Sequence, residues 1–205
     1  MIPILYDYLI SGNGYKVRLL LSQLNIPYEY RAVNIIKGEN HEPWFHDKNP
    51  MAQIPVLELT DGTCLRESSA ILMHVSRGTH LLPPEPMAQT HVLEWLCFEQ
   101  SNVDQVIARA RFRKMFPDVI PTRPEEFVAW HKQGHRALTV MDTHLRSHAF
   151  LVGDTYSIAD IALYAYTHKA EEGGFELGRY PSVQRWFGRV EAMPGYLSID
   201  TVPVS

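Results

Sequence analysis

The chain has 205 residues, of which 45% are hydrophobic and 20% are charged, and its formal net charge at pH 7 is −4. This composition is ordinary for a globular protein, and the charge gives no reason to expect nucleic acid or an anionic membrane as a partner. No apolar run approaches the ~20 residues of a membrane-spanning helix. The N-terminus lacks the basic and long apolar regions of a signal peptide, so we expect a cytoplasmic protein.

The first 78 residues predict strands and helices in the order β-α-β-α-β-β-α. Strands are expected over 2–6, 28–33, 54–59 and 63–66, and helices from near Tyr15 to Leu24, over 43–47 and over 68–77. Asp61 and Gly62 predict a tight hairpin between the last two strands. This pattern indicates an α/β domain over residues 1–78.

The remainder of the chain changes character after a Pro-rich segment. Residues 79–87 read as a linker, and residues 88–205 show helical periodicity only. Helices are expected over 88–114, 124–147, 158–170 and 182–192. Ser157 followed by Asp160 predicts a capping box at the start of the third of these helices.

The two cysteines, Cys64 and Cys97, form neither a CxxC pair nor a spacing typical of metal ligands. One falls in an expected strand and the other in an expected helix. We therefore expect two buried, reduced thiols and no metal site. A reaction that needs a thiolate would not obviously obtain it from this chain.

Several stretches in this order and spacing resemble the glutathione transferase superfamily. In the first domain they are Leu5–Tyr6 with SGNGYKVR at 11–18, NPMAQIPVL at 49–57 and LRESSAIL at 65–72. In the second domain they are LVGD at 151–154, YPSV at 180–183 with Trp186, and MPGY at 193–196. Ser11-x-Asn13 is similar to the bacterial and fungal (nu-like) groups that carry Ser or Thr, then Asn. Ser101 departs from those groups, where an aromatic residue is more usual.

The resemblance implies a glutathione transferase fold, with a thioredoxin-like domain over 1–78, a linker over 79–87 and an all-α domain over 88–205. It implies glutathione as cosubstrate without a metal, a small electrophilic or disulfide second substrate, and a homodimer. Three functions stay open. They are thiolate transfer to an electrophile, glutathione-dependent disulfide reduction or peroxidase activity, and a non-catalytic glutathione-binding scaffold. Isomerase and cysteine-based activities are disfavoured because no Cys occupies positions 11–14.

The resemblance also implies which residues hold the tripeptide. Pro55 would be a cis-proline, and the backbone N–H and C=O of Ile54 just before it would pair with the cysteinyl backbone of glutathione. Glu67 would take the α-ammonium of glutathione. The free backbone amides at the helix start, with the Ser68 hydroxyl as an added donor, would take its γ-glutamyl carboxylate. Gln53 and His41 would contact the glycyl end. Taken alone, each has a plainer interpretation: a strand-opening proline, a solvated first-turn Glu and a surface His.

Ser11 is the expected thiolate donor, because a hydroxyl hydrogen bond near a helix N-terminus favours the charged form of the thiol. Asn13 adds an amide donor on the same side. The alternative is that both residues only shape a turn, and Tyr6 and Tyr8 are rival donors. In the second domain, Arg109, Arg111, Arg113 and Lys114 cluster on one helix. They suit a solvated or interdomain salt-bridging face, or a cationic wall for an acidic cosubstrate such as a second glutathione.

Overall fold

The structure is a computed structural model that describes residues 2–203. Backbone contacts divide the chain into two compact units. The first runs to Arg77 and also takes in the segment that starts at Met193, while the second is Gly78–Ala192.

The first unit contains a four-stranded mixed sheet. Its order is β2 (Glu29–Ala32), β1 (Ile4–Asp7), β3 (Val56–Glu58) and β4 (Cys64–Leu65). Strands β1 and β2 are parallel, whereas β3 is antiparallel to both of its neighbours. The predicted hairpin joins β3 to β4, and Gly62 adopts φ 85° in its turn, a conformation that glycine reaches without steric cost.

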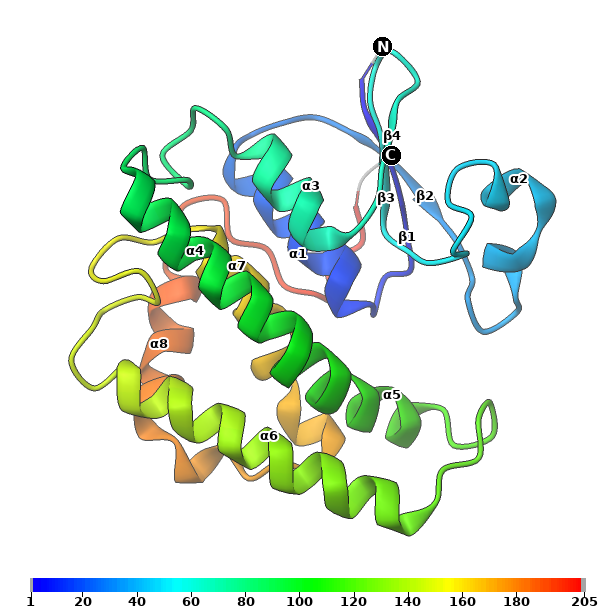
Figure 1. The fold of residues 1–205 in the computed structure, drawn as a ribbon. Helices are drawn as coiled ribbons and strands as arrows, with labels where there is room; N and C mark the ends of the chain where they lie inside the picture. The colour runs from blue at the N-terminus through cyan, green and yellow to red at the C-terminus, as the bar shows by residue number, and fades with distance from the viewer. Residues whose placement is uncertain (1, 204–205) are drawn as a thin grey trace. The chain divides into compact units, whose positions relative to one another are not determined.

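Helices cover both faces of this sheet. Helices α1 (Gly12–Gln23) and α3 (Ser68–Val75) lie side by side on one face, and the short α2 (Pro43–His46) lies on the other, preceded by a 3₁₀ turn over Glu39–His41 (Figure 1). Successive strand residues point to opposite faces, so each face has its own core. The α1/α3 face buries Leu5, Val17, Leu21, Leu57 and Ile71. The α2 face buries Tyr6, Val33, Phe45 and Val56.

Helix α1 begins three residues earlier than the sequence pattern predicts. Ser11 is its N-cap, with extended backbone angles, and the Ser11 Oγ accepts a hydrogen bond from the Gly14 amide at 3.3 Å. A side-chain acceptor at the N-cap satisfies one of the amides that a helix start leaves unpaired. This cap allows the helix to start at Gly12 and not near Tyr15.

The segment that follows Met193 packs with the first unit, although the sequence pattern had grouped it with the second domain over 88–205. Side chains on α1 hold its backbone: Tyr15 Oη donates to the Leu197 carbonyl at 2.7 Å, and Arg18 Nη1 donates to the Ile199 carbonyl at 3.0 Å. These contacts join residues more than 180 positions apart, which local patterns do not reveal.

The second unit is helical, as predicted. Its α-helices are α4 (Pro86–Glu99), α5 (Arg109–Met115), α6 (Pro124–His144), α7 (Ile158–Thr167) and α8 (Pro181–Glu191), and two 3₁₀ turns cover Ala170–Gly173 and Leu177–Arg179. The long helix expected over 88–114 is continuous but not uniform, because a π-helix over Gln100–Ala108 separates α4 from α5. Among the described residues, no helix is both long enough and apolar enough to cross a membrane.

The predicted capping box at the start of α7 is confirmed. The Ser157 amide donates to Asp160 Oδ2 at 3.0 Å, and the Ser157 side chain in turn caps the first turn of α7. Asp160 is fully buried and also accepts from Trp186 Nε1 at 2.9 Å. Burial raises the pKa of the Asp160 carboxyl to about 6.

The prediction of two buried cysteines is wrong. Cys97 lies on an exposed position of α4, and Cys64 is half-buried in β4. Residue type alone favours burial of a free cysteine, but the side of the element on which it falls decides its exposure.

Candidate functional site

The register of the sheet brings three separate segments of the first unit to one end. Tyr6 pairs with Val56, and Leu57 pairs with Leu65. Continuing these antiparallel pairs by one or two residues places Pro55 beside the C-terminal end of β1 and Glu67 beside Pro55. From the end of β1 the chain turns directly into Ser11. The first turns of α1 and α3 and the Ile54–Pro55 peptide therefore meet at this end of the sheet.

The peptide bond between Ile54 and Pro55 is cis, as the sequence motif predicts. The ladder between β1 and β3 starts at Val56, so Ile54 lies beyond the paired part of the strand. The backbone before it is held from two sides. Asn49 Nδ2 donates to the Gln53 carbonyl at 2.7 Å, and Asn40 Nδ2 donates to the Ala52 carbonyl at 2.8 Å.

His41 is linked through Asn40 to the backbone that precedes Gln53. His41 Nε2 lies 3.3 Å from Asn40 Nδ2, whose amide also holds Ala52, the residue before Gln53. Both His41 and Gln53 are exposed to solvent.

Glu67 occupies the N-cap position of α3 with φ 64° and ψ 112°. A non-glycine residue with positive φ is uncommon, and such conformations concentrate at ligand-binding sites. The Glu67 side chain is exposed, while the next residue, Ser68, is 4% exposed. The first amides of α3 have no acceptor within the helix, so this end of the site offers a carboxylate beside backbone donors.

The Ser68 hydroxyl links α3 to α1. Ser68 Oγ donates to Asn13 Oδ1 at 3.1 Å. The expected contact of Ser68 with a γ-glutamyl carboxylate stays a prediction, and the backbone amides of the first turn of α3 are further donors at that position.

The Ser11 hydroxyl can serve as helix cap and as donor at the same time. Its oxygen accepts from the Gly14 amide, and a hydroxyl has one O–H donor besides two acceptor lone pairs. Accepting the amide therefore leaves the Ser11 proton available for a second partner. Ser11 is half-buried, so that proton can reach a bound molecule.

Beneath Ser11 lies a buried ion pair between β1 and α1. Asp7 Oδ2 and Arg18 Nε are 3.0 Å apart, and both side chains are 0% exposed. A Cβ on Gly14 would lie 1.5 Å from Asp7 Oδ1, so only glycine lets this carboxylate sit under the first turn of α1. Burial raises the pKa of Asp7 to about 7, although Arg18 opposes the rise.

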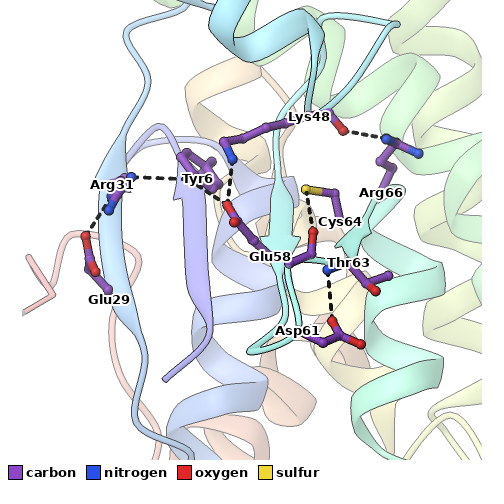
Figure 2. Close-up of polar contacts among 10 residues, drawn as sticks. Tyr6, Glu29, Arg31, Lys48, Glu58, Asp61, Thr63, Cys64 and Arg66 are labelled. Carbon is purple, nitrogen blue, oxygen red and sulfur yellow. Dashed lines mark hydrogen bonds and ion pairs between the residues drawn. The ribbon is translucent and has the colours of Figure 1, made fainter. Parts of the chain in front are cut away.

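Tyr6, the rival donor, points to the other face of the sheet and is engaged there (Figure 2). Its hydroxyl donates to Glu58 Oε2 at 2.8 Å, and Lys48 Nζ donates to the same oxygen at 2.7 Å. Arg31 Nη1 donates to the Tyr6 oxygen at 3.3 Å. Burial, followed by the hydrogen bond to Glu58, raises the pKa of Tyr6. The one proton of this phenol is therefore already committed.

Cys64 packs against the same α2-face core as Tyr6, and its sulfur lies 3.9 Å from the Gly62 carbonyl in the hairpin turn (Figure 2). Cys97 belongs to the second unit. Across residues 2–203, no three His, Cys, Asp or Glu side chains gather in a way that would hold a metal ion.

Of the basic residues on α5, Arg111 is 7% exposed in its side chain and pairs with Glu172 at 2.6 Å. Arg113 Nη1 donates to the Ile120 carbonyl at 3.3 Å, and Arg109 donates to the Gln105 side chain. These three contacts lie within the second unit, and the one made by Arg111 is an ion pair.

Sequence reasoning missed one residue that the structure places in the site, namely Lys16. Its side chain is buried on α1, and Lys16 Nζ lies 2.7 Å from Asn13 Oδ1. The signal was present, because Asn13 and Lys16 are three residues apart and therefore neighbours on a helix. With the helix expected to begin near Tyr15, that neighbour relation was not visible.

Two family descriptions match this chain: "Glutathione S-transferase, N-terminal domain" over residues 5–77 and "Glutathione S-transferase, C-terminal domain" over residues 104–194. Together they cover most of the sequence. The chain belongs to the glutathione transferase family, with a thioredoxin-like first part and a helical second part.

Curated relatives carry different activity names. A probable maleylacetoacetate isomerase of Vibrio cholerae is 30% identical over 94% of this chain and 93% of its own length. The disulfide-bond oxidoreductase YfcG of Escherichia coli is 28% identical over 90% of this chain and 88% of its own. At this identity, neither name assigns a specific activity to this chain.

Two solved structures are also similar. A glutathione S-transferase from Pseudomonas fluorescens shares 47% identity, with a TM-score of 0.94 over 97% of this chain and 99% of that one. A glutathione transferase from Burkholderia graminis, solved with two glutathione molecules per subunit, shares 26% identity, with a TM-score of 0.82 over 95% of this chain and 85% of that one.

Proposed function

We propose that this protein is a glutathione transferase that binds glutathione at the end of the sheet where α1, α3 and the Ile54–Pro55 peptide meet. The observation that carries the proposal is the sheet register, which gathers a hydroxyl, an amide, a free strand edge and a carboxylate from three segments. Glutathione has a thiol, a peptide backbone, an ammonium and two carboxylates, so it needs such a mixed set of partners. A structural neighbour that binds glutathione supports the same ligand.

In this arrangement Ile54 pairs with the cysteinyl backbone of the ligand as an added strand. Glu67 takes the α-ammonium as a charge-assisted hydrogen bond, and the first amides of α3 take the γ-glutamyl carboxylate. Gln53 and His41 contact the glycyl end.

The thiol of the ligand then lies against the start of α1. The Ser11 hydroxyl and the Asn13 amide donate to the sulfur, and the positive end of the α1 dipole faces it. These interactions favour the thiolate over the thiol. The S–H proton leaves to solvent, and the sulfur lone pair forms the bond to an electrophilic atom of the second substrate. That atom either loses a leaving group, which departs with its electron pair, or belongs to an activated double bond, whose electron pair moves away from it and takes up a proton from solvent. Ser11 acts as a donor and is never acylated.

Binding is tested by isothermal calorimetry with reduced glutathione. We expect binding by the wild-type protein and at least a tenfold weaker affinity for Glu67→Ala, which leaves the ligand ammonium without its carboxylate; one such charged pair is worth about 1.5–3 kcal/mol. Glu125→Ala, an exposed first-turn Glu of α6 in the second unit, is the matched control. Absence of binding by wild type at millimolar glutathione would refute the proposal.

Glutathione-dependent disulfide reduction is the second candidate, and the name of the YfcG relative favours it. Cys64 lies on the α2 face and Cys97 in the second unit. We therefore infer that any disulfide chemistry uses the ligand thiol, which attacks the substrate disulfide and releases a thiolate. A Cys64→Ser/Cys97→Ser double variant should keep both transferase and reductase rates. Selective loss of the reductase rate would show that a protein thiol takes part.

We also propose that the protein forms a two-fold dimer, as glutathione transferases usually do, in which the first domain contacts the second domain of the partner. Sedimentation equilibrium at micromolar concentration tests this assembly. A monomer mass would refute it.

A further inference from the structure

Lys16 is a fully buried lysine in the first unit. It sits on α1, its exposed fraction is 0%, and its ammonium reaches oxygens on two different helices. Lys16 Nζ lies 2.7 Å from Asn13 Oδ1 on α1 and 3.4 Å from Ser68 Oγ at the start of α3. Burying an ammonium costs several kcal/mol unless hydrogen bonds compensate, and these two oxygens are among the groups that compensate Lys16.

The chemistry of lysine fixes the orientation of the Asn13 amide. An ammonium has three donors and no acceptor, so the Asn13 atom that faces Lys16 must be the carbonyl oxygen and not the nitrogen. Ser68 Oγ accepts a hydrogen bond from Lys16 and donates one to the same Asn13 Oδ1, at 3.1 Å. Lys16 and Ser68 thus both donate to Oδ1 and hold it facing them, and the NH₂ group lies on the other edge of the Asn13 amide.

We propose that Lys16 is a positioning residue that keeps the NH₂ group of Asn13 turned toward the sulfur of bound glutathione. The inference rests on the proposed function, because it assumes that the sulfur lies at the start of α1. Without Lys16, the amide of Asn13 can turn over and present its oxygen to the thiolate, which would repel the charge. The same ammonium ties Asn13 to the first turn of α3, so the thiol end and the γ-glutamyl end of the site are set together.

The test measures the pKa of the glutathione thiol in the complex by recording thiolate absorbance as a function of pH. We expect Lys16→Met to raise that pKa by about 0.5–1 unit, a three- to tenfold loss of thiolate near neutral pH. Lys132→Met, which removes the same charge from an exposed position of α6, should leave it unchanged. Lys16→Gln keeps a neutral donor, so the thiol pKa of its complex should lie between those of wild type and Lys16→Met. If Lys16→Met does not fold, Lys16→Gln takes its place in the test.

A double-mutant cycle separates positioning from a general effect on the site. If Lys16 acts through Asn13, Lys16→Met in an Asn13→Ala background should move the thiol pKa by less than ~0.3 units, because the two effects are not additive. Equal shifts in both backgrounds would overturn the inference, as would an unchanged pKa in the Lys16→Met single variant.

Failure of the proposed function gives a different result. If the thiol of glutathione bound to the wild-type protein titrates near ~8.5, as a free thiol does, the site does not stabilise a thiolate and both proposals fall. If the wild-type complex has a lowered thiol pKa and the Lys16 variants have the same thiol pKa as wild type, the Lys16 inference alone is wrong.

Discussion

The two faces of the sheet in the first unit differ in how their polar side chains are hydrogen-bonded and buried. On the α2 face, the buried Tyr6 hydroxyl is hydrogen-bonded to Glu58, and the paired side chains of Glu58 and Lys48 stay partly exposed. On the α1/α3 face, Asp7, Lys16 and Arg18 are fully buried, while Ser11 at the start of α1 is half-buried and accepts a hydrogen bond from the Gly14 amide. A hydroxyl that only accepts from its neighbours still has its proton to donate, whereas a hydroxyl that already donates to a neighbour does not.

Two carboxylates make the contrast measurable. Burial raises the pKa of Asp7 to about 7, because loss of solvent outweighs its pairing with Arg18. The pKa of Glu58 is lowered, first by the hydrogen bond from Lys48 and then by that from Tyr6. The same residue chemistry, on the two faces of one sheet, therefore responds to pH with opposite sign.

The largest effect is expected from Gly14→Ala, which breaks the α1 side of the comparison. The added Cβ would lie 1.5 Å from Asp7 Oδ1, and the buried carboxylate has little room to move. We expect the free energy of unfolding to fall by at least ~3 kcal/mol, as measured by urea denaturation. Gly188→Ala in α8, where an added Cβ meets nothing within 4 Å, should be neutral or stabilising by about 0.5–1 kcal/mol. Equal effects in the two variants would contradict this packing.

Asp7 should impose a pH dependence on stability. Its folded-state pKa of about 7 lies above the ordinary value of 3.8, so between those values the folded protein keeps a proton that the unfolded chain has released. Stability therefore falls as pH rises through this window. Relative to Asp7→Asn, the wild-type protein should lose roughly 3–4 kcal/mol between pH 4 and pH 8.

The measurement for Asp7 is the urea midpoint of both proteins at several pH values. Asp118→Asn, at an exposed position, serves as control and should run parallel to wild type. A constant difference between wild type and Asp7→Asn across the range would mean that Asp7 is ionised throughout.

Ser11 and Tyr6 give the direct functional comparison of the two faces. Removing a donor to a full anion in a well-ordered site costs about 3 kcal/mol, and Asn13 partly replaces the lost bond. We expect Ser11→Ala to raise the pKa of the bound thiol by roughly one unit, or 1–2 kcal/mol. Tyr6→Phe should leave that pKa unchanged, because its proton goes to Glu58. The reverse pattern, read from thiolate absorbance, would make Tyr6 the donor.

The smallest effect is expected from Glu58→Gln on the α2 face. The lowered pKa of Glu58 means that its contribution is present above the unfolded-state value of 4.5 and is lost as pH falls through the folded-state value. Since the pair with Lys48 is partly exposed, we expect a loss of about 0.5–1 kcal/mol at pH 7, reduced by high salt. Urea denaturation at low and high ionic strength measures both, and a loss that salt does not reduce would contradict the assignment.

Much of the fold followed from the sequence because the signals are local. The Asp61–Gly62 turn and the Ser157–Asp160 capping box join residues within three positions of each other, and both are as predicted. Backbone conformation at these two points depends on neighbouring residue types, so a single chain suffices to predict it. The cis bond at Ile54–Pro55, which the structure contains, was instead implied by the resemblance to the glutathione transferases.

The tertiary structure decided which polar groups are already paired. Tyr6 meets Glu58, and Lys16 meets Ser68, across 52 residues in each case. Arg18 meets Ile199 across 181 residues. Whether a hydroxyl or an ammonium is buried, and to which oxygen it donates, is set by strand register and helix packing. Residue types and spacing named Ser11 and Tyr6 as rival donors, and only the folded sheet places their protons on different sides.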